Sequence, residues 1–281
     1  MEKESFAPRL HAILARDANT AIVFRRGPSK RVGLFRWNLK DNSFEEGQWL
    51  KGRIYERRSD LSPDGQYLIY FAMNGRWKSE TGGSWTAISK PPWLKAISLF
   101  RKGDCWEGGG LFLDRRKFWL NDRYYSGKRA MRMSSEVELS TDFPLDQYYG
   151  SEDTGIYYPR LIRDGWNLLE WRSRVDNAHD ITVFEKPLQR GWKLRKIAHA
   201  QVGPPEGRGC YWDEHILMNE KSGAEIAQPD WEWADARGSH VYFAQNGCIG
   251  TSQIKNMETF RSPSTLQDFS DFSFRAVAAP S

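Results

Sequence analysis

Short hydrophobic runs recur along this chain, each placed after an aspartate at intervals of about fifty residues. The aspartates are Asp17, Asp64, Asp114, Asp164 and Asp213. Runs of this length, bounded by turn-forming residues, are typical of β-strands rather than of helices. A repeat of this size predicts a β-propeller, in which every repeat forms one blade of antiparallel strands.

The strand pattern is complete in some repeats and weaker in others. The first, second and fourth repeats each hold four strand-like segments, and the fourth is expected to open with a strand at 158–162. The third loses its pattern after residue 120, which predicts longer loops and weaker outer strands. We therefore expect a single all-β domain over residues 1–281, a propeller of five blades at about 9–53, 54–103, 108–155, 157–205 and 207–280. A second turn-and-strand pattern at 229–247 leaves six blades as the alternative.

The second repeat contains the most specific motif of the chain, Ser62-Pro63-Asp64-Gly65 followed by an apolar run. Proline presets φ, aspartate can accept a hydrogen bond from the backbone two residues on, and glycine tolerates a positive φ. The motif resembles the repeats of TolB-like and WD-repeat propellers, and this resemblance implies a fold rather than an activity. By the same turn chemistry we expect structural turns at Asp17, Ser62, Pro63, Asp64, Gly65, Asp114, Asp164, Gly165, Asp213 and Asp235.

Composition narrows the class of protein. Hydrophobic residues make up 40% of the chain, with 13 Trp, which is ample for an aromatic core between sheets. The start of the chain carries acids and a proline instead of a secretory signal, and no stretch is long and apolar enough to span a membrane. Three separated cysteines suggest neither a disulfide framework nor a thiolate zinc site. We therefore expect a cytoplasmic protein without membrane contact.

The segment 212–215 is the nearest approach to a metal or acid–base cluster. In a strand, neighbouring side chains point to opposite faces, so only Asp213 and His215 could converge, which is too few for a zinc site. No nucleophile elbow or phosphate-binding loop is present. The three glycines at 108–110 lack the spacing of a dinucleotide site and are expected to allow a tight entry into the next strand. We therefore predict no metal, no cofactor and no catalytic residues.

The segment between positions 115 and 132 mixes basic and aromatic residues. Such a mixture can grip phosphates and stack bases, although an inner core strand flanked by a solvated charged loop explains it as well. The formal charge of +5, from 41 basic and 36 acidic residues, lends nucleic-acid binding only modest support. The candidate binding residues are Arg115, Arg116, Arg123, Tyr124, Tyr125, Arg129, Trp93 and Trp106.

Three functions are compatible with this sequence. The favoured one is a non-catalytic propeller that serves as a platform for another protein through its blade-connecting loops. One alternative is a hydrolase or lyase that acts on a sugar or peptide at the central channel, with carboxylates such as Asp114, Asp213 or Glu214. The other alternative is a nucleic-acid-binding module that uses residues 115–132.

Overall fold

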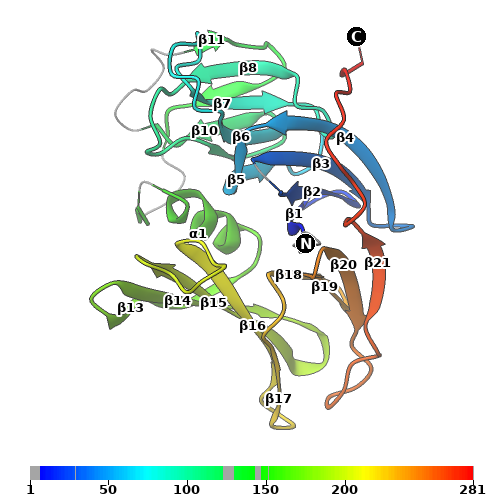
Figure 1. Ribbon diagram of the computed structural model, residues 1–281. Helices are drawn as coiled ribbons and strands as arrows, with labels where there is room; N and C mark the ends of the chain where they lie inside the picture. The colour runs from blue at the N-terminus through cyan, green and yellow to red at the C-terminus, as the bar shows by residue number, and fades with distance from the viewer. Residues whose placement is uncertain (1–6, 29, 123–129, 143–146, 151, 281) are drawn as a thin grey trace, which may run out of the picture. The chain divides into compact units, whose positions relative to one another are not determined.

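The protein is all-β in class, and its described residues form five sheets in a computed structural model (Figure 1). The structure describes residues 7–28, 30–122, 130–142, 147–150 and 152–280. Contacts divide the described chain into two compact units. Unit 1 comprises residues 11–160 and 272–280, and unit 2 comprises residues 7–10 and 161–271.

The first sheet is an antiparallel meander that follows the order of the chain. It is formed by β1 (Arg9–Leu14), β2 (Thr20–Arg26), β3 (Arg31–Asn38) and β4 (Ser43–Lys51). The second sheet is a meander of β5 (Arg53–Leu61), β6 (Leu68–Met73), β7 (Ser84–Ser89) and β8 (Ala96–Arg101), with β11 (Ala130–Arg132) added beside β8. Strands β1 to β4 thus span residues 9–51 and β5 to β8 span residues 53–101, whereas β11 joins the second sheet from beyond the range expected for the second repeat.

The third sheet is smaller and has a different order, β12-β10-β9. It consists of β9 (Gly110–Phe112), β10 (Lys117–Leu120) and β12 (Glu138–Ser140), and β12 runs parallel to β10. The connection between β10 and β12 includes β11, which pairs with β8 in the second sheet instead. The third repeat therefore lacks the regular four-stranded meander of the first two in its described part.

The core of unit 1 lies between successive sheets. Ile22, Phe24 and Leu34 of the first sheet pack with Leu68 and Ala72 of the second. A further buried cluster joins the second and third sheets, where Ile69, Ile88 and Phe100 meet Phe112 and Phe118. Removing such side chains from water is the main stabilising term for sheets of this kind.

The Ser62–Gly65 segment forms the tight turn between β5 and β6. The Ser62 hydroxyl donates to the Asp64 carboxylate at 2.7 Å and accepts the backbone N–H of Tyr67 at 2.9 Å. Asp64 also accepts the backbone N–H of Gln66 at 3.1 Å, and Gly65 has a φ of 74°. The side chains thus satisfy backbone groups that a turn leaves unpaired.

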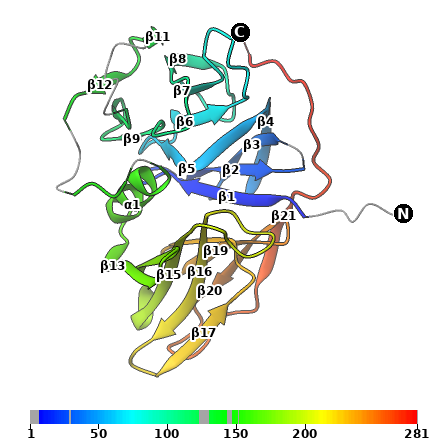
Figure 2. The same cartoon turned by 60° about the vertical axis from the view of Figure 1, so that its left-hand side comes forward.

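Unit 2 contains the last two sheets (Figure 2). The fourth sheet consists of β13 (Asn167–Asp176), β14 (His179–Pro187), β15 (Trp192–Gln201), β16 (Tyr211–Asn219) and β17 (Ala224–Gln228), with the one-turn helix η1 (Gln189–Gly191) between β14 and β15. The fifth consists of β18 (Trp233–Arg237), β19 (His240–Gln245), β20 (Cys248–Gln253) and β21 (Ser264–Asp268). Both are antiparallel meanders in chain order.

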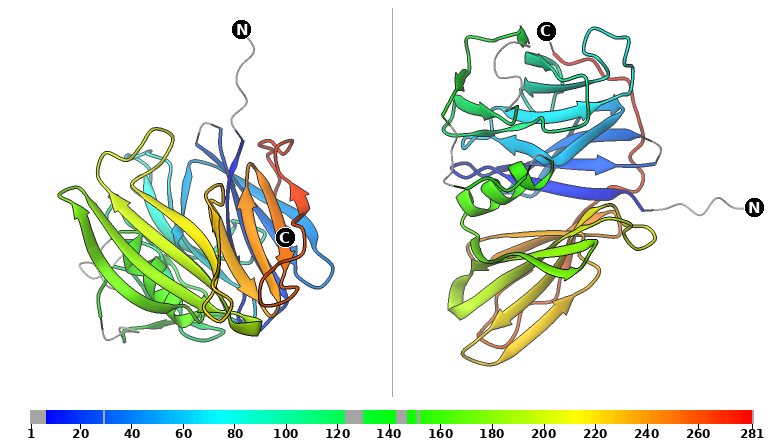
Figure 3. Two further views of the ribbon diagram at one scale, coloured as in Figure 1. Left: turned by 90° about the horizontal axis from the view of Figure 1, so that it is seen from below. Right: turned by 90° about the vertical axis from the view of Figure 1, so that its left-hand side faces the viewer.

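The strand expected at 158–162 is wrong, because this segment lies in the helix α1 (Thr154–Arg163), drawn in green in Figure 3. All residues from Gly155 to Leu161 are buried, so burial is not limited to one face of this helix. Asp164 and Gly165 do lie in a turn, but the turn ends this helix instead of joining two strands.

The border between the last two sheets also differs from the expected one. Asp213 lies inside β16 and Asp235 inside β18, so neither is at a turn. The hairpin β16–β17 completes the fourth sheet, and the fifth begins at Trp233, well after the expected start near residue 207. A short turn at 229–230 separates the two sheets.

Two further findings concern membrane-spanning helices and the cysteine thiols. No helix in the described ranges has the length and apolar character needed to cross a membrane. All three cysteines are free thiols, with Cys105 and Cys210 exposed and Cys248 half-buried.

Candidate functional site: a charged cavity beside β10

An open cavity of about 1050 Å³ lies in unit 1 beside the turn that joins β9 to β10. The loops after β1 and β5 and the segment that leads into β12 complete its walls. Its lining residues are Arg16, Asp17, Pro63, Leu113, Asp114, Arg115, Arg116, Lys117, Met133, Ser135, Val137, Glu138 and Leu139. The cavity therefore gathers Asp17, Pro63, Asp114, Arg115 and Arg116, five residues singled out in the sequence.

Asp114 shapes this turn through its carboxylate. It accepts the backbone N–H groups of Arg116 and Lys117, both at 2.7 Å. These two bonds lower the pKa of Asp114 below its ordinary value because they stabilise the charged form, and the bond from Lys117 has the larger effect. Asp114 thus acts as a turn cap and stays ionised at neutral pH.

Two of the basic residues at the cavity are committed to the protein itself. The Arg116 guanidinium donates to the carbonyl oxygens of Glu136 at 2.6 Å and Ser135 at 2.8 Å. Lys117 lies 3.9 Å from the Asp142 carboxylate. Arg116 therefore fixes the segment that leads into β12, and its guanidinium N–H groups are partly engaged by these carbonyl groups.

Arg115 is different, because it is exposed and forms no hydrogen bond or ion pair with the described residues. It stands at the tip of the β9–β10 turn, held by the backbone bonds to Asp114. The opposite wall supplies Arg16 and Asp17 from the loop after β1. The Asp17 N–H donates to the Pro63 carbonyl at 2.8 Å, so this wall is anchored to the Ser62–Gly65 turn.

Apolar side chains share the cavity with these charges. Leu113, Met133, Val137 and Leu139 all line it. Met133 is 45% exposed, whereas Val137 is buried and belongs to the core between the second and third sheets. The cavity thus combines four basic and three acidic side chains with an apolar wall, a composition that suits a ligand with both charged and apolar groups.

The remaining predicted binding residues do not reach this cavity. Arg123, Tyr124, Tyr125 and Arg129 lie outside the described residues. Trp93 is half-buried beside the second sheet. Trp106 is 59% exposed, on the loop between β8 and β9.

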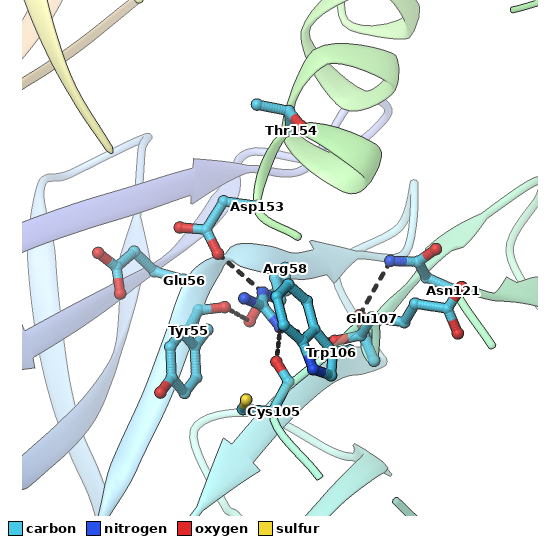
Figure 4. Close-up of polar contacts among 12 residues, drawn as sticks. Tyr55, Glu56, Arg58, Cys105, Trp106, Glu107, Asn121, Asp153 and Thr154 are labelled. Atoms are coloured by element: carbon cyan, nitrogen blue, oxygen red, sulfur yellow. Dashed lines mark hydrogen bonds and ion pairs between the residues drawn. The ribbon is translucent and has the colours of Figure 1, made fainter. Parts of the chain in front are cut away.

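A buried arginine holds the loop that carries Trp106 (Figure 4). Arg58 on β5 donates to the carbonyl oxygens of Cys105 at 2.8 Å and Glu107 at 2.7 Å. Its Nε lies 2.8 Å from the carboxylate of Asp153, just before α1. A single guanidinium thus ties β5 to the loop and to the segment that precedes the helix.

Burial affects the carboxylate of this ion pair. Burial raises the pKa of Asp153 above its ordinary value, and Arg58 opposes that shift. Glu56 is a second buried carboxylate nearby and pairs with Arg26. These groups are packed against the fold and line no part of the cavity.

The glycines of this loop have the steric role expected of them. Gly108 and Gly109 have φ of 83° and 79°, and a Cβ on Gly109 would lie 1.8 Å from the Arg58 carbonyl oxygen. A Cβ on Gly110 would lie 2.2 Å from the Trp119 carbonyl oxygen. The close approach of backbone segments therefore requires glycine here.

Asp213 and His215 converge as expected for alternate residues of a strand, but on a lysine. The buried Lys196 Nζ lies 2.9 Å from His215 Nε2 and 3.5 Å from the Asp213 carboxylate. Glu214 points the other way and lies 3.7 Å from His199 Nε2. The described residues contain no group of three or more potential metal-ligating side chains.

Sequence reasoning missed much of the cavity and of the Arg58 cluster. Arg16, Met133, Ser135, Glu138 and Leu139 carry no motif, and they meet the β9–β10 turn only through the fold. Nor did any pattern connect Arg58 with Asp153, which are far apart in the chain. The run of charges at 56–58 inside an otherwise strand-like segment was the available signal.

Comparisons with known proteins assign no family. No protein-family profile matches the chain, and no curated protein does. A solved structure that matches is prolyl oligopeptidase B from Galerina marginata, bound to a 35mer hydrolysis and macrocyclization substrate. It is 8% identical over 93% of this chain, with a TM-score of 0.34, and the match spans 42% of that protein. The function therefore has to be argued from the site itself.

Proposed function

We propose that this protein is a non-catalytic interaction protein whose cavity beside β10 binds an extended segment of a partner protein. The segment would carry acidic and apolar side chains. The observation that carries the proposal is the cavity lining, in which the exposed Arg115 and, from the loop after β1, Arg16 share one open space with Leu113, Met133 and Leu139. Arginine anchors and apolar contacts are the groups enriched at protein interfaces.

The architecture supports rigid presentation of this cavity. Asp114, Arg116 and the Asp17–Pro63 bond fix its walls through backbone hydrogen bonds. A prearranged site loses little conformational entropy on binding. We further propose a five-bladed cytoplasmic propeller, and the succession of five sheets along the chain supports it.

The roles of the carboxylates favour binding over catalysis. Asp114 is engaged as a turn cap, and Asp213 is engaged with Lys196. A hydrolase would need two carboxylates free to exchange protons on either side of a scissile bond. Structural roles for Asp114 and Asp213 leave Glu214 as the remaining one of the three candidate carboxylates, whereas such an enzyme needs a pair.

The test is a selection of random peptides displayed on phage against the full protein, with counter-selection against Arg115→Glu. We expect enriched peptides in which acidic and apolar residues recur at a fixed spacing, and we expect them to be lost on the variant. Arg261→Glu is the control for net charge, because Arg261 is exposed in unit 2. No enrichment, or enrichment insensitive to Arg115, would contradict the proposal. Salt-sensitive binding of a labelled single-stranded oligonucleotide instead would favour the nucleic-acid alternative.

A further inference from the structure

The outer strand of the fourth sheet exposes apolar side chains. β13 is ten residues long and pairs only with β14 among the described strands, so one edge carries no strand partner there (Figures 1 and 2). Leu169, Trp171 and Val175 are 52%, 44% and 56% exposed. Exposed apolar residues on a long edge strand are a liability unless something covers them.

The exposed residues coincide with irregularities in the pairing of β13. Leu168 and Glu170 pair with consecutive residues of β14, which leaves Leu169 as an extra residue, and Val175 is extra in the same way. Between the pairs made by Glu170 and Ser173, Trp171 and Arg172 together face a single residue of β14, and Arg172 has a φ of 54°. Bulges re-aim side chains, and here they turn apolar groups outward.

Side chains of opposite charge, and apolar side chains, lie at equal separations on either side of Arg172 in β13. Glu170 and Arg174 lie two residues to either side, and Leu169 and Val175 lie three residues to either side. Arg172 and Arg174 both contact the Asp180 carboxylate, at 2.8 and 3.5 Å, so within the chain one acid is shared by two arginines. Two copies of this strand set antiparallel about Arg172 would place each acid beside a base and each apolar residue beside another.

We propose that β13 is a homodimer interface, formed with β13 of a second copy around a two-fold axis at Arg172. Leu169 contacts Val175 of the second copy, and Glu170 pairs with its Arg174, each contact occurring twice. An isologous interface requires this self-complementarity. The bulges interrupt any continuous backbone ladder between the copies, so side chains supply the specificity.

Charge reversal gives a sharp test in the full protein. Sedimentation velocity at about 1 to 100 µM measures the dissociation constant of the wild type, Glu170→Arg, Arg174→Glu and the double variant. Each single reversal creates two like-charge pairs, and we expect a rise in the dissociation constant of at least about tenfold. The double reversal restores the opposite-charge pairs and returns the constant to within about threefold of wild type.

All altered residues are exposed, so the variants should fold, and Glu206→Arg is a control at another exposed acid of unit 2. A wild-type protein that stays monomeric throughout this range would overturn the proposal. So would a dimer that is indifferent to both single reversals, or one that the double variant does not restore. None of these three results bears on the cavity of unit 1.

Discussion

Replacement of Arg58 by methionine tests whether the buried guanidinium holds unit 1 together. Methionine keeps much of the side-chain volume but removes the ion pair with Asp153 and the bonds to the Cys105 and Glu107 carbonyl oxygens. Arg58 is only 3% exposed, so water does not replace these partners without rearrangement. Breaking one side of a buried ion pair typically costs about 3–5 kcal/mol, and we expect a loss of that size.

The effect should depend on pH in a defined direction. Burial already raises the pKa of Asp153, so the folded protein binds more protons here than the unfolded chain. This contribution disfavours the folded state as pH rises from the ordinary aspartate range through the raised pKa. Loss of Arg58 removes the group that opposes the shift, so the destabilisation should be largest at neutral pH and smaller near about pH 4.

Urea denaturation followed by tryptophan fluorescence and far-UV circular dichroism at both pH values measures the free energy of unfolding. The matched control is Lys90→Met, because Lys90 forms an exposed pair with Glu136 at 2.6 Å. Exposed pairs contribute at most about 1 kcal/mol. A loss for Arg58→Met no larger than that of the control, or one that grows as pH falls, would refute the reasoning.

Three further changes probe other parts of the fold, each read as a free energy of unfolding in urea. Gly109→Ala should cost more than about 2 kcal/mol, because its Cβ would meet the Arg58 carbonyl oxygen and its φ is positive. Gly75 also has a positive φ but lies in open space, so Gly75→Ala should cost about 1 kcal/mol. Equal losses for the two variants would count against the steric argument. Asp64→Ala should cost about 1–2 kcal/mol through lost turn bonds, and a neutral result would show that they are dispensable. Lys196→Met should cost about 3–5 kcal/mol because it removes the ion pair with the buried Asp213 carboxylate, and a stabilised variant would mean that apolar packing outweighs the ionic network.

Local chemistry made the first two sheets predictable. The Ser62–Gly65 turn and the alternation around it identify β5 and β6 because each backbone need is met by a neighbouring residue. The same logic failed at 158–162, where the short run from Tyr158 to Ile162 suggested a strand. This segment is instead helical and buried from Gly155 to Leu161, an environment that only the tertiary structure supplies.

The aspartate repeat misled the interpretation of the second half of the chain. Asp213 follows the earlier aspartates at the same interval of about fifty residues, yet it lies inside β16, and its carboxylate is near the buried Lys196 of β15. An ion pair between neighbouring strands depends on the register of β15 and β16, which spacing along the chain does not encode. The cavity was predictable only at Arg115 and its neighbours, because its other walls come from distant segments.

The most direct test of the proposed function is the affinity of one selected acidic, apolar peptide, measured by isothermal titration calorimetry with wild type, Arg115→Glu and Arg261→Glu. Arg115 is exposed at the cavity and makes no bond within the described structure, so its reversal should leave the fold intact. We expect Arg115→Glu to raise the dissociation constant at least about tenfold, equivalent to about 1.4 kcal/mol, and the control to leave it unchanged. Equal affinity for all three proteins would contradict peptide binding in this cavity.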